Sequence, residues 1–291
     1  MNTTPNYFEW FLHELLRWSK STALWAVILV GAFMTFMAIT GTVARKVPEL
    51  EQGLIDGKTL SDFTLSMSFS GALFASILGI VVVTGDFTTK FSTRLFLFNR
   101  LPFTLMIVKS AVAALLGLVL GAVILVTCWF STQGFLAARG YEFFPPQNLW
   151  QWAGSHLVMF TLSAIWGVAL GFIFRNTVIA IMFHVLYLMG VEATLMAIFP
   201  SVAKWLPGGT QSAIIDDITL PQRLGMLPGV GVYSLWVIGL FVIAAVLLMK
   251  FNQPVLPSLT NLVAKRLSFT KKPATNLQTP SVTEKPQPIT R

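Results

Sequence analysis

Residues 110–130 read SAVAALLGLVLGAVILVTCWF, an apolar run without one charged side chain. A helix rises about 1.5 Å per residue, so about 20 apolar residues cross the ~30 Å hydrocarbon core of a bilayer. The run extends back to Thr104 and includes Lys109 near its start. Because lipid offers the backbone no hydrogen-bond partner, the stretch predicts a membrane-spanning helix over about 104–130.

Five further stretches of the chain have the same character. Of the 291 residues, 55% are hydrophobic and 11% are charged, whereas globular proteins carry about 25% charged residues. We therefore predict an all-α polytopic membrane protein with six transmembrane helices in a domain over residues 23–250. The predicted spans are about 23–43, 63–84, 104–130, 149–174, 177–199 and 229–249.

The distribution of Lys and Arg predicts the orientation. With the N-terminus inside, 14 of the 20 basic residues fall in cytoplasmic segments, although Arg45 and Lys46 locally oppose this assignment. An excess of Lys and Arg marks cytoplasmic loops. We therefore expect both termini in the cytoplasm. The net charge of +8 is then a topology signal that also attracts lipid headgroups, and no nucleic-acid partner is expected.

The two ends of the chain differ in kind. Within 1–22, an amphipathic helix over 7–20 is predicted to lie in the membrane interface, either as an anchor or as a lever moved by a partner. Its apolar side holds Phe8, Phe11, Leu12, Leu15 and Trp18, and its polar side holds Glu9, His13, Glu14, Arg17 and Lys20. Residues 251–291 form a basic tail rich in Pro and Thr, for which we expect disorder.

The most unusual connection joins the second and third spans, where residues 85–102 read GDFTTKFSTRLFLFNRLP. Asp86 is suited to cap a helix start, and Pro102 to end the helix. The pattern predicts a short amphipathic cytoplasmic helix over about 86–100. It is either a docking element for a cytoplasmic subunit or an interfacial helix without a partner.

This region resembles the membrane subunits, or permeases, of type-2 ABC exporters. The resemblance rests on Gly85, Asp86, Phe87, Thr93, Arg94, Arg100, Pro102 and Lys109. The family usually has Glu at the place of Asp86 and Pro before Arg, whereas Arg100 precedes Pro102 here. A second similarity is the Trp205–Gly209 motif, WLPGG, after the fifth span.

The resemblance implies an exporter of a drug, peptide antibiotic or other amphiphile in a bacterial plasma membrane. It implies that the 86–100 helix docks on a separate ATP-binding subunit, and that a second permease subunit, identical or paralogous, completes the pathway. The residues implied in coupling are Asp86, Phe87, Lys90, Phe91, Thr93, Arg94 and Arg100. The chain has no G-x-x-x-x-G-K-[ST] phosphate loop, so ATP and Mg are expected on the partner, and this chain is expected not to be an enzyme.

Three ionisable residues lie well inside the predicted spans, namely Glu192, His156 and His184. Such residues usually face protein or water. Glu192 and His156 fall at similar predicted depths, so one hypothesis is that Glu192 lines the substrate pathway and pairs with His156. The alternative is a structural hydrogen bond between helices. Segment 200–227 is either a short re-entrant piece or an ordinary loop.

Two other functions stay open from the sequence. An intramembrane enzyme would need a nucleophile and base, or several metal ligands, that converge. The lone Cys128 excludes a cysteine cluster, and His184 lies at another depth from His156. A secondary carrier would need internal repeats and membrane carboxylates, and the spans hold only Glu192. The pairs Gly117/Gly121 and Gly167/Gly171 predict close helix packing within the chain rather than a dimer contact.

Overall fold

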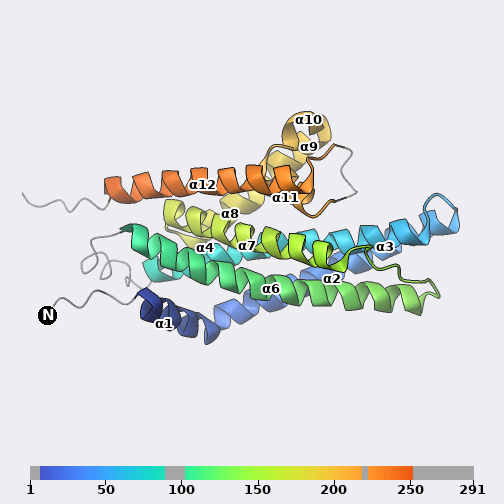
Figure 1. The fold of residues 1–291 in the computed structure, drawn as a ribbon, viewed down its shortest axis with the longest axis horizontal. Coiled ribbons are helices and arrows are strands. Elements are labelled where there is room, and N and C mark those ends of the chain that lie inside the picture. Colours follow the sequence, from blue (N-terminus) through green and yellow to red (C-terminus); the bar gives the residue numbers. More distant parts are fainter. Residues whose placement is uncertain (1–6, 89–101, 218–221, 252–291) are drawn as a thin grey trace, which may run out of the picture. The chain divides into compact units, whose positions relative to one another are not determined.

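The computed structural model describes residues 7–88, 102–217 and 222–251, and within these ranges it is helical without a β-strand. The long helices lie alongside one another (Figure 1). The first half of the chain forms α1 Tyr7–Ser19, α2 Thr22–Glu51, α3 Gly57–Ser66, the 3-10 turn η1 Met67–Phe69, α4 Ser70–Thr88 and α6 Pro102–Ala138. The second half forms α7 Leu149–Phe174, α8 Thr177–Leu186, the π-helix η2 Tyr187–Glu192, α9 Ala193–Ile198, α10 Pro200–Ala203, α11 Pro207–Ile214 and α12 Met226–Phe251.

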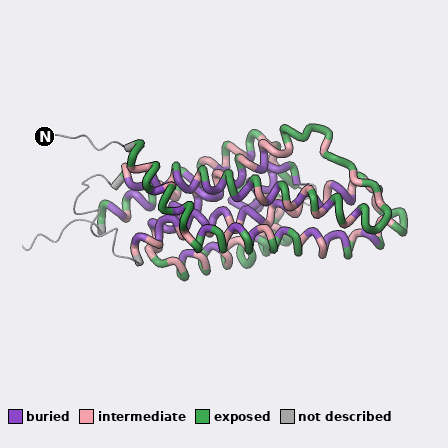
Figure 2. The backbone as a smooth tube through the Cα atoms, turned by 90° about the horizontal axis from the view of Figure 1, so that it is seen from below, coloured by how far each residue is buried: buried purple, intermediate pink, exposed green. Residues whose placement is uncertain are grey.

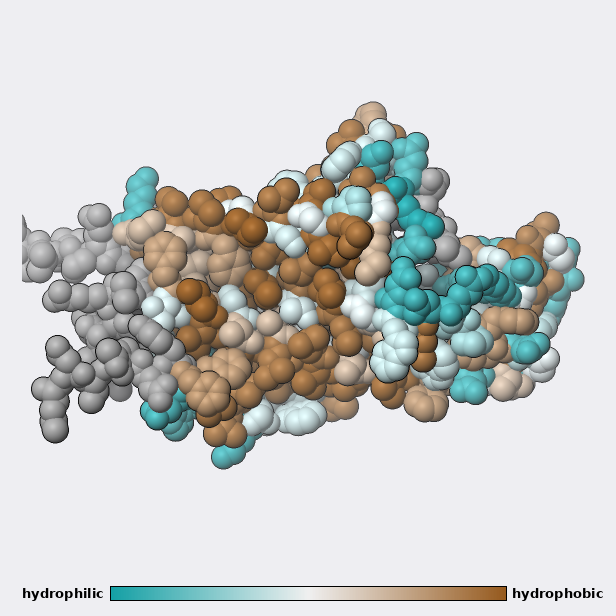
Figure 3. Space-filling view, viewed as in Figure 1, coloured by the Kyte–Doolittle hydropathy of each residue, from teal (hydrophilic) through white to brown (hydrophobic). Residues whose placement is uncertain are grey.

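Within the described residues, six helical stretches are long and apolar enough to cross a membrane, which is the predicted number. They are Thr22–Glu51, Gly57–Phe87, Phe103–Ala138, Leu149–Phe174, Thr177–Ile198 and Met226–Lys250. Figure 3 shows apolar side chains over the middle of the helices and hydrophilic ones gathered towards the end that α3 occupies. The fold is therefore that of a multi-pass α-helical membrane protein.

The first three stretches run past their predicted outer ends. Arg45, Lys46 and Pro48 end the apolar run of the first span, yet α2 continues to Glu51 through all three. Lys46 pairs with Glu49 at 2.8 Å, one turn away, which supports the helix after its apolar run has ended. A second buried cluster, including Val47, Leu60 and Leu136, holds these helix ends together. A loss of apolar character therefore marked the end of the run but not the end of the helix.

The centre of the bundle is the contact between α4 and α7, with α6 packed on α7. Figure 2 shows buried residues along the inward sides of the helices. A β-carbon at Gly79 would meet the carbonyl oxygen of Ala164, and one at Gly167 would meet that of Ser76. Gly117 and Gly121 of α6 likewise approach Phe160 of α7. The glycine pairs thus serve packing within the chain, as predicted.

Segment 200–227 contains a buried helix rather than only a loop over the helix ends. Every residue of α11, Pro207–Ile214, is buried. The helix packs against α12 and touches α7. Pro207 occupies its first turn, where the missing amide proton costs no hydrogen bond. Of the two alternatives for this segment, the structure favours an element inserted among the long helices.

Candidate functional site

Four charged side chains from three helices meet where α4 ends and α6 begins. They are Glu14 and Arg17 of α1, Asp86 of α4 and Lys109 of α6. Lys109 forms ion pairs with both Glu14 and Asp86, and Arg17 Nη2 lies 2.6 Å from Glu14 and 2.7 Å from Asp86. We call these four residues the charge network. Two acids and two bases give it no net formal charge.

Three of the four side chains in the charge network are buried, and Arg17 is 41% exposed. Lys109 is only 2% exposed, and its ammonium also donates to the carbonyl oxygen of Val82 at 3.1 Å. The ammonium therefore faces two carboxylates and one carbonyl oxygen. Trp18 Nε1 donates to Glu14 Oε1 at 3.0 Å. Buried charges are tolerable only when paired in this way.

The position of Glu14 corrects part of the predicted face of the N-terminal helix. Glu14 is 5% exposed, whereas the helical spacing placed it on the polar side. Phe11, Leu15 and Trp18 pack on the core as predicted, while Phe8 and Leu12 are exposed. The prediction of a helix was right, but the polar side was wrong for Glu14, because Lys109 pairs with it.

The position of Asp86 corrects a second prediction. Asp86 does not cap a new helix, because α4 runs on through it to Thr88. Its carboxylate is 4% exposed and faces Lys109 and Arg17. Asp86 therefore joins α4 to α1 and α6, and its predicted coupling role stays a prediction. The predicted coupling residues Lys90, Phe91, Thr93, Arg94 and Arg100 lie outside the described residues.

Phe87 lies beside the charge network on the last turn of α4. Its ring packs edge-on against Phe172, with centroids 6.4 Å apart, and the guanidinium of Arg175 lies 5.8 Å from its centre. Arg175 ends α7 with a left-handed backbone, φ 53°. Burial lowers the pKa of Arg175 from its ordinary value, although a guanidinium stays charged in proteins. Phe87 thus joins the ends of α4 and α7.

A second polar feature lies on a largely apolar cavity of about 640 Å³ between α2, the η1–α4 region, the η2–α9 region and α11. Drug-sized ligands occupy cavities of about 300–1,000 Å³. Its polar lining includes Glu192, Gln211, Ser212 and Asp217. Its apolar lining includes Met34, Met67, Phe69, Phe74, Met189 and Met196. We call this space the Glu192 cavity.

Glu192 is fixed by the start of α11. Its Oε1 accepts hydrogen bonds from the amides of Gly208 at 2.5 Å and Gly209 at 3.0 Å. A carboxylate is favourable there because helix N-termini carry free amides and a positive dipole end. Glu192 is also the last residue of η2, and π-helical turns often occur at functional sites. The predicted structural role for Glu192 is thus realised with a backbone partner.

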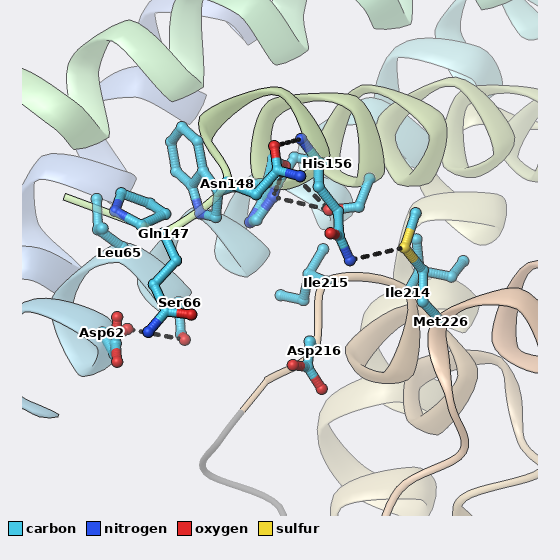
Figure 4. Close-up of a pocket in the computed structure, with 14 residues that line it drawn as sticks. Asp62, Leu65, Ser66, Gln147, Asn148, His156, Ile214, Ile215, Asp216 and Met226 are labelled. Atoms are coloured by element: carbon cyan, nitrogen blue, oxygen red, sulfur yellow. Dashed lines mark hydrogen bonds between the residues drawn. The ribbon is translucent and has the colours of Figure 1, made fainter.

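The two histidines do not join Glu192 in a hydrogen bond. His156 Nδ1 lies 2.7 Å from the carbonyl oxygen of Trp152 in its own helix. His156 lines a different pocket of about 270 Å³, together with Asp62, Asn148 and Asp216 (Figure 4). His184 is buried, and neither ring nitrogen has a hydrogen-bond partner among the described residues. The hypothesis of a Glu192–His156 pair is therefore wrong.

Two sets of buried polar residues were not predicted from the sequence. Lys109 was recognised only as a family-like position, although a Lys within a span predicts a buried carboxylate partner. Gln211, Tyr233 and Ser163 form a buried hydrogen-bonded group, with Gln211 Nε2 at 2.5 Å from Tyr233 Oη and 3.1 Å from Ser163 Oγ. No spacing rule connects these three residues, because they come from α11, α12 and α7.

Comparison with known proteins adds no family assignment. No protein-family model, curated protein or solved structure matches the chain. The class is therefore defined by the fold alone, a six-span helical membrane protein, and its function has to be argued from its own residues.

Proposed function

We propose that this chain is the membrane subunit of a transporter that exports an amphiphilic substrate and is driven by a separate ATP-binding subunit. The chain then carries no ATPase site, and ATP and Mg bind to the partner. A second permease subunit completes the pathway, in a plasma membrane with both termini in the cytoplasm. The alternatives of an intramembrane enzyme and a secondary carrier have no comparable support from the described residues.

The observation that carries this proposal is the place of the charge network. Asp86 lies on the last turn of α4, and Lys109 lies two turns into α6. These are the helices on either side of residues 89–101, the centre of the predicted coupling segment. Because Lys109 pairs with Asp86, the two helix ends are joined to each other and, through Glu14, to α1. A force applied to 89–101 would therefore reach three helices together.

The Glu192 cavity is the second support. A transporter needs a place for its substrate among the spans, and this cavity combines a broad apolar lining with a few buried polar groups. That combination is typical of small-molecule sites. The cavity lies between elements of both halves of the chain, and α11 closes part of it with a buried turn. A movement of α11 relative to α2 would change its access.

Affinity purification tests the partnership directly. The full chain is purified from its native host in several mild detergents, and bound proteins are identified by mass spectrometry. We expect a stoichiometric ATP-binding subunit that Arg94→Glu releases. Arg139→Glu is the matched control, because Arg139 is an exposed residue that follows α6 at the opposite end from Lys109. Failure to recover such a subunit, or equal retention by both variants, would contradict the proposal.

Cysteine labelling tests the orientation separately. Cys128 is the only cysteine and is buried, so Cys128→Ser gives a background without a reactive thiol. Arg139→Cys and Lys271→Cys are then added singly. In intact cells, a membrane-impermeant maleimide is expected to label position 139 but not position 271. The reverse pattern would place the termini outside.

A further inference from the structure

The Glu192 cavity has a chemical bias that its size alone does not reveal. Two residues that line it each hold one buried oxygen without a hydrogen-bond partner among the described residues, Glu192 Oε2 and Gln211 Oε1. Both residues are buried, Glu192 at 1% and Gln211 at 2% exposure. Buried polar atoms without partners are uncommon and call for an explanation. Both atoms are hydrogen-bond acceptors, so a ligand group that pairs with them has to be a hydrogen-bond donor.

The charges around the cavity have the same sign. Glu192 and Asp217 line it, and none of its described lining residues is Lys, Arg or His. Arg223 donates to the backbone carbonyl of Asp217 at 2.7 Å and pairs with Asp216 at 2.9 Å. The N-terminus of α11 is already occupied by Glu192 Oε1. The free oxygen of this carboxylate is thus left for a cation.

The other residues that line the cavity indicate the chemical character of the rest of the ligand. Four methionines, Met34, Met67, Met189 and Met196, and the rings of Phe69 and Phe74 surround the cavity. Methionine side chains are flexible and polarisable, and they suit surfaces that accept ligands of varied shape. Aromatic rings add favourable contacts with a cation. A ligand with an apolar body and one charged donor matches both parts of the lining.

We infer that the Glu192 cavity binds an amphiphilic ammonium, a primary or secondary amine in its protonated form attached to an apolar body. The ammonium donates to Glu192 Oε2 and Gln211 Oε1, and the apolar body lies against the methionines and phenylalanines. This inference rests on the proposed transport function for its biological role and identifies the substrate class. The binding itself requires no ATP-binding partner.

The test uses the full chain in phosphatidylcholine nanodiscs, with dansylcadaverine as the probe. This compound joins an aromatic body to a primary ammonium and fluoresces more strongly in an apolar site. Its N-acetyl derivative has nearly the same body and no charge. After subtraction of empty nanodiscs, we expect the ammonium to bind about tenfold more tightly than the acetylated form. Equal affinity for the two compounds, or no binding of either, would overturn the inference.

Three variants locate the binding. Glu192→Gln keeps an acceptor for Gly208 and Gly209 but removes the charge, so the preference for the ammonium should fall to about twofold or less. Asp62→Asn makes the same chemical change in the pocket that His156 lines, and the preference should persist. Leu73→Trp fills the Glu192 cavity and should weaken both compounds. A preference retained in Glu192→Gln would overturn the inference even if the variant folds normally.

The outcome is separable from that of the proposed function. If no ATP-binding subunit is recovered but the ammonium still binds, the binding site is supported and the ATP-driven transporter is contradicted. Recovery of that subunit, with no difference between the two probes, keeps the transporter and refutes the ammonium site. The two experiments use different variants, at Arg94 and at Glu192, and different readouts.

Discussion

The charge network and the Glu192 cavity both hold buried carboxylates, yet they differ in how these charges are paired. In the charge network, Lys109 forms ion pairs with Glu14 and Asp86 and donates a hydrogen bond to the carbonyl oxygen of Val82. At the cavity, Glu192 Oε2 and Gln211 Oε1 have no partner among the described residues. Paired charges hold helices together, whereas a carboxylate without a basic partner is suited to a ligand that brings one. The two regions should therefore respond differently to substitution.

The largest effect is expected from Lys109→Met. It removes the ammonium that pairs with the buried carboxylates of Glu14 and Asp86, and breaking a buried ion pair costs about 3–5 kcal/mol. At about 2–4 °C per kcal/mol for a chain of this size, Tm in detergent should fall by roughly 6–20 °C. The control is Lys46→Met, which removes a partly exposed pair with Glu49 and should cost about 1 kcal/mol or less. Equal losses in the two variants would contradict the comparison.

Two substitutions of Glu192 separate its acceptor role from its charge. Glu192→Leu strands the amides of Gly208 and Gly209 and should cost about 1–3 kcal/mol. Glu192→Gln keeps an acceptor in the same place and should cost less than about 1 kcal/mol. Thermal unfolding of both variants, followed by Trp fluorescence, checks this order. A Gln variant as unstable as the Leu variant would show that the charge itself holds α11.

Arg17→Met should have a smaller effect on the charge network than Lys109→Met. The side chain of Arg17 is 41% exposed, so water screens its interactions and replaces them in part. We expect a loss of about 1 kcal/mol in the free energy of unfolding. Thermal unfolding of Arg17→Met and Lys109→Met, measured side by side, gives the ratio of their losses in the free energy of unfolding. If Arg17→Met is the more damaging, then Arg17 rather than Lys109 is the centre of the network.

The smallest effect lies outside both regions, at the start of α3. The side chain of Asp56 accepts a hydrogen bond from the Thr59 amide at 2.7 Å. Hydrogen bonds from the side chain and the amide of Thr59 lower the pKa of Asp56 from its ordinary value of 3.8. The cap therefore stabilises the fold above that value, and the stabilisation is lost as pH falls through the lower, folded-state pKa. Asp56→Ala should lower Tm slightly at pH 6, and this difference should disappear once the pH is below the folded-state pKa. Asp56→Asn, which keeps a capping oxygen, is the control.

The features that were predicted correctly from the sequence are those that depend on residues close together in the chain. The fourth span was predicted at 149–174, and α7 has those bounds because Asn148 caps its start and Arg175 turns left-handed at its end. The number of spans and the packing role of the glycines followed from local patterns as well. The path of α2 beyond Arg45 did not, because an ion pair and a packed cluster sustain the helix after the apolar run has ended.

The candidate site was less predictable, because its partners are far apart along the chain. Glu14 and Lys109 are separated by 95 residues, and Glu192 and Gly208 by 16. Helical periodicity placed Glu14 on a solvated face because no local signal could reveal a buried ammonium opposite it. The hypothesis that paired Glu192 with His156 used depth alone, and depth does not specify which helices are neighbours.

The members of the charge network are synthesised in a fixed order. Lys109 belongs to the third span, whereas its partners Glu14 and Asp86 come earlier in the chain. Synthesis proceeds from the N-terminus, so both carboxylates leave the ribosome before the Lys that needs them. An ionised Lys within a span is costly to insert without a partner. The counter-charges of Lys109 are therefore already made when the third span is synthesised, and α1 supplies one of them.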